Sequence, residues 1–194
     1  MTDPASLDLL SRTGWPGELT LLLRRYPRET WDDHANMGRM ARFWLDIHGG
    51  FRRAGATLTA STGDSREGLV TPDRFRAWYG PRLQTFLNHL NGHHQIEDFQ
   101  MFPLFGAAEP QLVRGFDVVE ADHGVIHAAM DRMADTANAF MQVDPGDRDK
   151  MRFAGDAYAD AGDALMAMLA RHLGDEEDLV IPLILDRGEE RLGL

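Results

Sequence analysis

The sequence HHQIEDFQMFP at residues 93–103 returns in altered form as HLGDEEDLVIP at residues 172–182. Each copy begins with a histidine, has an acidic pair that starts four residues later, and ends on a proline ten residues after the histidine. Another histidine precedes each copy in the chain, at His48 and at His123. Histidines and carboxylates that recur at helical spacing are the side chains that a metal site inside a helix bundle needs.

The composition excludes several kinds of protein. A chain of 194 residues, 43% of them hydrophobic, can bury a sizeable core. Lys and Arg number 20 against 31 Asp and Glu, and the formal net charge of -11 would repel a nucleic acid or an anionic membrane. Because the chain contains no cysteine, a metal must be held by nitrogen and oxygen donors. Neither a signal-peptide pattern nor a long apolar run is found, so we expect a cytoplasmic protein without a membrane partner.

Helical periodicity dominates the chain, and the alternating β-branched runs that mark strands are missing. We therefore expect an all-α fold. Residues 31–194 are expected to form an antiparallel up-down-up-down four-helix bundle, and residues 1–30 an N-terminal arm that packs on it.

Four expected helices follow from capping residues and prolines. The first begins near Asp32 or Asp33 and ends near residue 60, and a polar loop follows at residues 61–68. The others begin at Thr71-Pro72, at Glu109-Pro110 and at Asp144-Pro145, and end near residues 102, 141 and 181. Gly80-Pro81 predicts a kink or a short break in the second helix.

The apolar stripes of these helices continue into polar groups. In the second helix the spacing through Leu83, Phe86 and Leu90 leads on to His93 and Glu97. The same spacing of three and four residues places further donors on the inward faces of the helices, namely His48, His123, His127, His172 and Glu176. A buried carboxylate without a partner costs several kcal/mol. With at least one imidazole from each of four helices, the pattern predicts a metal site.

Three histidines receive other assignments. His34 lies near a helix start, and His89 has no acidic partner in register. His94 has Asp98 four residues later, but it points about 100° away from His93. We therefore expect His94 at the surface or in the surroundings of the ligands.

The pattern over about residues 33–186 resembles the hemerythrin and HHE cation-binding domain family. It consists of His48, His93-x-x-x-Glu97, His123-x-x-x-His127 and His172-x-x-x-x-Glu177. The resemblance implies two iron ions with an oxo or hydroxo bridge, held by these five histidines, and bridged also by Glu97 and one acid of the last helix. Manganese and zinc accept the same donor types.

The identity of the second bridging acid stays open. Helical periodicity and the internal repeat favour Glu176, because the residue four positions after His172 stays on the same face. The family's oxygen carriers have Asp five residues after the histidine. That spacing favours Glu177, which is slightly preferred.

The resemblance implies a protein that binds dioxygen or a related diatomic such as nitric oxide, for sensing, carriage or scavenging. Five histidines to two acids favour reversible binding over oxygenase chemistry. No catalytic residue is expected outside the ligands, and no protein partner is predicted. The alternatives are a di-iron enzyme that acts on peroxide or nitric oxide, and a protein of iron storage, repair or sensing.

Overall fold

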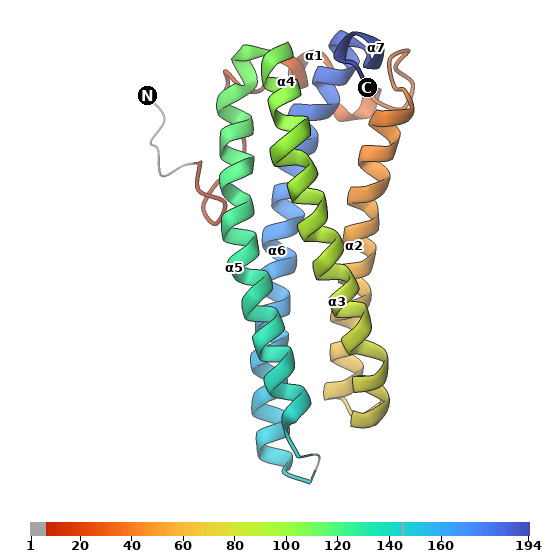
Figure 1. Cartoon of the computed structure of the whole chain (residues 1–194), viewed down its shortest axis with the longest axis vertical. Coiled ribbons are helices and arrows are strands. Elements are labelled where there is room, and N and C mark those ends of the chain that lie inside the picture. The colour runs from red at the N-terminus through yellow and green to blue at the C-terminus, as the bar shows by residue number, and fades with distance from the viewer. Residues whose placement is uncertain (1–6, 145) are drawn as a thin grey trace. The chain divides into compact units, whose positions relative to one another are not determined.

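The computed structural model describes residues 7–144 and 146–194, without the side chains of Arg66 and Pro72. This part of the chain is helical and contains no strand (Figure 1). The long helices are α2 (Arg39–Arg66), α3 (Pro72–Ile96), α5 (Val113–Gln142) and α6 (Arg148–Arg187). The short elements are α1 (Leu21–Arg25), η2 (Arg28–Thr30), η3 (Glu97–Met101), α4 (Phe102–Ala108), η4 (Pro110–Leu112) and α7 (Glu189–Leu192). The prediction of an all-α bundle with an N-terminal arm is confirmed.

Two compact units divide the chain. Unit 1 contains the described part of residues 1–49 with residues 93–124 and 170–194, and unit 2 contains residues 50–92 and 125–169. All predicted metal-binding residues except His127 fall in unit 1. The predicted division into residues 1–30 and 31–194 stays a prediction. Residues 1–6 of the predicted arm and the predicted helix start at Pro145 lie outside the described residues.

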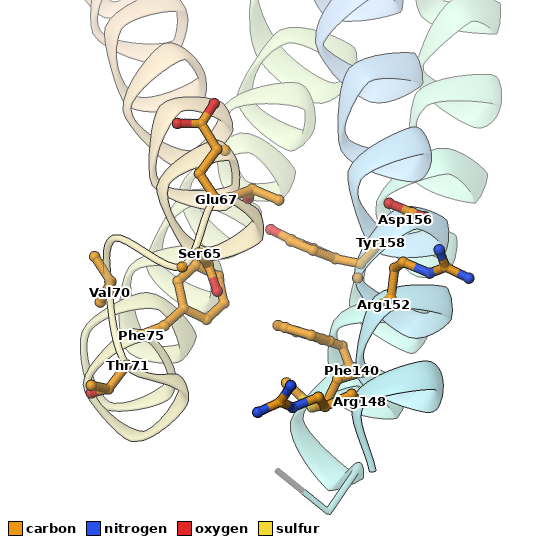
Figure 2. A pocket seen from close by; sticks show the side chains of 15 residues that line it. Ser65, Glu67, Val70, Thr71, Phe75, Phe140, Arg148, Arg152, Asp156 and Tyr158 are labelled. Atoms are coloured by element: carbon orange, nitrogen blue, oxygen red, sulfur yellow. The ribbon is translucent and has the colours of Figure 1, made fainter. Parts of the chain in front are cut away.

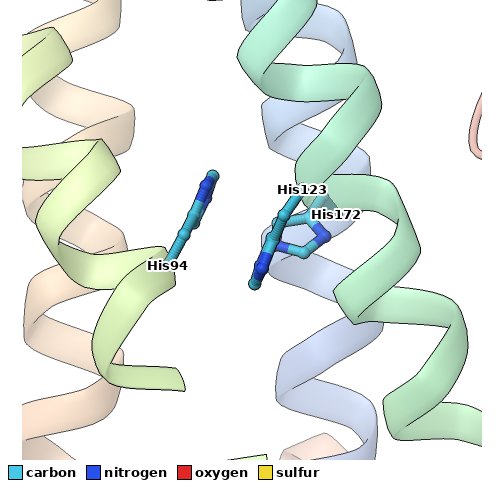
Figure 3. A group of neighbouring side chains, drawn as sticks. All are labelled: His94, His123 and His172. Carbon is cyan, nitrogen blue, oxygen red and sulfur yellow. The ribbon is translucent and has the colours of Figure 1, made fainter. Parts of the chain in front are cut away.

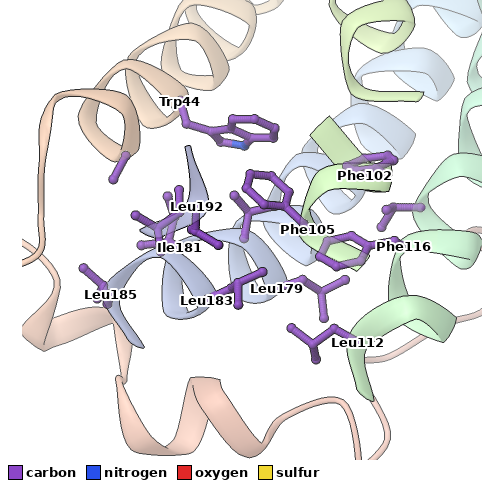
Figure 4. Packing of buried hydrophobic residues seen from close by; sticks show 14 of the residues in the cluster. Trp44, Phe102, Phe105, Leu112, Phe116, Leu179, Ile181, Leu183, Leu185 and Leu192 are labelled. Carbon is purple, nitrogen blue, oxygen red and sulfur yellow. The ribbon is translucent and has the colours of Figure 1, made fainter. Parts of the chain in front are cut away.

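The hydrophobic core of unit 1 surrounds the end of α6. Leu179 to Leu185 are buried without exception, so this stretch of helix is covered on every side (Figure 4). Aromatic rings of α2, α4 and α5 pack against it, namely Trp44, Phe102, Phe105 and Phe116. The helix therefore continues to Arg187, beyond the predicted end near residue 181, because an apolar face all round is stable only inside a core.

The start of α2 depends on a carboxylate from the other end of the chain. Gly38 precedes Arg39 and has no side chain that can accept from the first free N–H groups of the helix. Oε1 of Glu189 accepts these bonds instead, from the N–H of Met40 at 2.7 Å and of Ala41 at 2.9 Å. A Cβ at Gly38 would lie 2.4 Å from the Glu189 carboxyl carbon, so any other residue here would displace the carboxylate from its present position.

The predicted start near residue 32 and the predicted loop at residues 61–68 are both wrong. The hydroxyls of Ser61 and Thr62 donate to backbone carbonyls one turn earlier, at 2.9 and 3.0 Å, so these small polar residues continue α2. The chain leaves the helix at Gly68, whose φ of 72° lies in the left-handed region that favours glycine after a helix end.

Helix α3 passes through Gly80-Pro81 without the predicted break. A proline removes one donor from a helix. Tyr79 and Leu83 are buried on either side, and the Arg82 guanidinium donates to the Trp78 carbonyl at 3.0 Å. Packing on both sides of the proline is therefore compatible with a continuous helix.

The backbone widens just after His93 and His94. At Glu97 the α pattern gives way to the π-helix η3, in which the Phe102 N–H donates to the Glu97 carbonyl. Pro103 cannot donate to the carbonyl one turn before it, which favours this wider turn. Isolated π-turns are frequent at functional sites, and this one begins at a predicted ligand.

Unit 2 contains aromatic rings and a cavity of about 850 Å³ (Figure 2). Phe75, Phe140 and Tyr158 are buried and form part of its wall. Its charged lining residues are two arginines and two acids, Arg148, Arg152, Glu67 and Asp156. Their formal charges cancel.

The contact of Glu189 with α2 can be tested by substitution. We expect Glu189→Ala to lower the free energy of unfolding by about 1 kcal/mol, because two N–H groups at the helix start lose their acceptor. The matched control is Glu190→Ala, on the neighbouring exposed residue, which should change it by less than about 0.5 kcal/mol. Urea unfolding of the metal-free protein measures both, and equal effects would contradict the capping role.

Candidate metal centre

Seven donor side chains meet inside unit 1 in two groups. One group contains two imidazoles and two carboxylates: His48, His93, Glu97 and Glu176. The other contains three imidazoles: His94, His123 and His172, from α3, α5 and α6 (Figure 3). Within each group one ligand atom per residue lies within 4.8 Å of the others. All seven are buried except His93, whose side chain is 10% exposed.

Imidazole nitrogens face each other within each group. His48 Nε2 lies 3.2 Å from His93 Nε2, and His123 Nε2 lies 3.1 Å from His172 Nε2. Two ligands that bind one ion at about 2.1 Å and at right angles are about 3 Å apart. The observed spacings therefore fit neighbouring positions around a metal ion.

Carboxylates on the side of the imidazole rings that is turned away from the donor groups determine which ring nitrogen faces the other donors. His123 Nδ1 lies 2.7 Å from Asp98 Oδ1, and His48 Nδ1 lies 3.0 Å from Glu177 Oε1. A carboxylate keeps a proton on Nδ1, so in both rings Nε2 is the nitrogen that is directed to the centre and available to a metal ion. His172 Nδ1 is 3.5 Å from Asp122 Oδ2, which orients the ring in the same sense although the contact is too long for a good hydrogen bond.

The two buried carboxylates lie between the groups. Glu97 Oε1 is 2.8 Å from His93 Nε2, and its Oε2 is 3.6 Å from His123 Nε2. Glu176 Oε2 is 3.7 Å from His48 Nε2 and 3.6 Å from His172 Nε2. Within the described residues none of the four oxygens accepts a well-directed hydrogen bond. Buried oxygens left in this state fit a bridging position between two cations.

Protons compensate these charges in the metal-free chain. Burial raises the pKa of Glu176 from 4.5 to about 8, and the charge of Glu97 adds to the shift. Burial alone would lower the pKa of His48, but Glu176, Glu177 and Glu97 outweigh it and raise this pKa to about 9. Burial lowers the pKa of His93 to about 4. A metal ion that binds here must displace the retained protons.

His94 occupies the place that the sequence assigns to His127. It is buried in the three-imidazole group, with its ring stacked on His123 at a centroid distance of 3.9 Å. His127 is half-buried on α5 and belongs to neither group of the described residues. Adjacent residues on a helix point about 100° apart, and the face that a bundle helix turns to the interior can be wider than this angle. His93 and His94 can therefore both face the interior, where each meets a different group of donors.

Glu176 and Glu177 take separate positions. Glu176 lies among the donors, as the helical periodicity and the repeat favour. Glu177, which the family spacing favours, lies outside both groups and joins His48 Nδ1 to the Arg28 guanidinium, 2.9 Å away. Five residues after His172, Glu177 lies about 140° around the helix from it, which turns its side chain away from the donors. Which of the two acids binds a metal stays a prediction, and the geometry favours Glu176.

Sequence reasoning missed the role of the outer carboxylates. Asp98 follows Glu97, Asp122 precedes His123, and Glu177 follows Glu176. An acid directly beside an expected ligand was the available signal. It is a weak signal, because adjacent residues on a helix usually face different surroundings.

The chain matches a known family of proteins. The model of the family described as the hemerythrin HHE cation-binding domain matches residues 39–184, which is most of the chain. No curated protein and no solved structure matches significantly. The matched segment includes all seven members of the two donor groups. Among the described residues, no helix is both long enough and apolar enough to span a membrane.

The retained protons make the stability of the metal-free protein depend on pH. Glu176 and His48 both have a raised pKa in the folded chain, so between about pH 6.5 and 9 the folded state binds protons that the unfolded state has lost. The free energy of unfolding should therefore fall as pH rises through this window, by at least about 1 kcal/mol.

Glu176→Gln provides the control for this prediction. It removes one titrating group and the main charge that raises the pKa of His48, so its stability should fall less steeply over the same window. Urea unfolding at pH 6.5 and pH 9 measures the two slopes. An equal slope in both proteins would show that other groups cause the dependence.

Proposed function

The chain belongs to the hemerythrin HHE cation-binding domain family, and from this membership and its buried donors we propose that it is a non-haem di-iron protein that binds dioxygen or a related diatomic such as nitric oxide. The observation on which this proposal depends is the pair of donor groups with Glu97 and Glu176 between them. Five imidazoles and two carboxylates are the donors that the family resemblance implies for a pair of iron ions, and nitrogen and oxygen donors of this kind suit iron. Manganese and zinc remain the metals to exclude by elemental analysis.

One iron would be held by His48 and His93, and the other by His94, His123 and His172. Glu97 and Glu176 would link the two ions. When bound, the iron pair supplies redox chemistry and an open coordination position. If both carboxylates are shared, the iron at the two-imidazole group has one imidazole fewer than the other, so the diatomic ligand is expected to bind on that side.

The repeat gives a reason for this asymmetry. His94 in the first copy corresponds to Leu173 in the second, and Leu173 is fully buried. The same internal symmetry pairs His48 with His123. It therefore places Leu173 where the two-imidazole group would otherwise have its third imidazole. A leucine at this position provides no ligand, so one coordination position would stay available to a small molecule.

Aromatic side chains make the surroundings dry. The Trp44 ring lies 5.9 Å from the His48 ring and 6.2 Å from the His93 ring, measured between centroids, and also packs on Phe105. Phe102 stacks on His123 at 5.8 Å. Exclusion of water favours reversible binding of the diatomic ligand over its release as an oxidised or reduced product. This favours sensing, carriage or scavenging.

The ligand assignment predicts the metal content of two histidine variants. We expect His94→Ala to lower the affinity for one of the two ions by at least about tenfold, because one of its three imidazoles is lost. His127→Ala, one turn along α5 from His123, should retain both ions. Titration with iron(II) under anaerobic conditions, followed by elemental analysis, measures both variants. Loss of metal in His127→Ala alone would restore the assignment made from the sequence.

Oxygen binding predicts an optical signal with its own control. The iron-loaded protein should gain absorption in the near ultraviolet and visible on exposure to oxygen, and lose it when oxygen is removed. Leu173→His adds an imidazole at the open side, so it should retain two ions and lose most of the oxygen-dependent absorption. Turnover of peroxide or nitric oxide without a reversible oxygen signal would instead assign the protein as an enzyme. Iron uptake without either would favour storage or sensing of iron.

A further inference from the structure

We propose that the N-terminal arm is part of the metal centre: Arg12 and Arg28 position two of its histidines through shared carboxylates, so that docking of the arm and binding of metal are thermodynamically linked. This inference rests on the proposed metal site. It concerns residues before the segment that the family matches, which begins at residue 39.

Arg12 forms the first connection. Its side chain is fully buried, an unusual place for a guanidinium unless it is paired. Nη2 lies 2.5 Å and Nη1 3.3 Å from the two oxygens of Asp122, and Nε lies 2.8 Å from Asp175 Oδ2. The same Asp122 Oδ2 faces His172 Nδ1 at 3.5 Å. Arg12 therefore fixes the carboxylate that orients an imidazole of the three-imidazole group.

Arg28 forms the second connection. Its Nη1 lies 2.9 Å from Glu177 Oε2, while the other oxygen of Glu177 lies 3.0 Å from His48 Nδ1. The guanidinium also lies 2.7 Å from Asp178 and donates to the Gly174 carbonyl at 2.7 Å. Arg28 thus reaches an imidazole of the two-imidazole group through one carboxylate.

Both arginines also contact the turns of α6 that contain His172 and Glu176, Arg12 through Asp175 and Arg28 through Glu177. Trp15 Nε1 donates to the Asp175 carbonyl at 2.9 Å, and the Arg171 guanidinium donates to the Arg12 carbonyl. One face of these turns therefore contacts the arm, and the other faces the donors. A change in the contact with the arm is therefore expected to change the position of the donors, and the reverse, because both involve the same short segment of α6.

The linkage has a definite sign. A cation on Nε2 makes the Nδ1–H of the same imidazole a stronger donor, which strengthens the bond of His48 to Glu177 and the attraction of His172 to Asp122, 3.5 Å away. These carboxylates are then held in the orientation in which they also bind the arm. Metal binding should therefore favour the docked arm, and by reciprocity the docked arm should increase the affinity for metal.

Arg25 provides a matched control on the same arm. It pairs with Asp186 of α6 at 2.8 Å, as Arg28 pairs with Glu177, but Asp186 forms no contact with any of the seven donors among the described residues. Substitution of Arg25 removes an ion pair between the arm and α6 without disturbing an imidazole. Arg28 is 43% exposed, so its replacement is expected to leave the fold intact.

The experiment compares wild type with Arg28→Gln, Arg28→Lys and Arg25→Gln. Affinity for cobalt(II) is measured by competition with a chelator, and the visible spectrum of the bound cobalt reports the ligand geometry. We expect about tenfold weaker binding and an altered spectrum in Arg28→Gln, partial rescue in Arg28→Lys, and a change of less than about twofold in Arg25→Gln. Hydrogen exchange of residues 7–30 should be slower in the metal-loaded wild type than in the metal-free protein.

The outcomes separate this inference from the proposed function. If Arg28→Gln binds metal as tightly as Arg25→Gln, and metal leaves the exchange of the arm unchanged, the linkage is refuted while the metal site stands. If wild type binds neither cobalt nor iron, the metal site itself fails. Arg12→Lys, measured in the same way, checks the connection to His172 with the buried charge retained.

Discussion

The buried carboxylates of Glu97 and Glu176 are the constraint on which the rest of this structure depends. Each is at most 1% exposed, and within the described residues their oxygens accept no well-directed hydrogen bond. Such groups are tolerated in a core only when a proton neutralises them or positive charge lies beside them. In the metal-free chain a proton neutralises Glu176 and a second proton makes His48 positive, and metal ions would provide the positive charge in the loaded chain. The assembly of the helices therefore depends on compensation of these charges as well as on the burial of apolar side chains.

Relations within a single helical turn were predictable from the sequence. His93 with Glu97 and His172 with Glu176 share a face because side chains four residues apart always do so in an α-helix. The same rule separates Glu176 from Glu177, and the structure agrees with it against the family spacing. The all-α class followed equally well, since it requires only the periodicity of the apolar residues.

Relations that depend on neighbouring helices were not predictable. Whether His94 faces outward or inward depends on how wide an arc of α3 is covered by other elements, which no single helix determines. The partners of Arg12 and Arg28 lie 110 and 149 residues away, and the cap of α2 comes from Glu189. Periodicity has no information on such pairs. They account for most of what orients the site and for the error in the predicted start of α2.

The acidic pair in each copy of the repeat can now be explained. In both copies the first acid faces the donors, and the second turns outward to the Nδ1 of a histidine that belongs to the other half: Asp98 to His123, and Glu177 to His48. Neither half can orient its own first histidine. The duplication therefore does not produce two independent sites. It produces one site in which each half positions a donor of the other, and this requires two acids per copy although only one faces the centre.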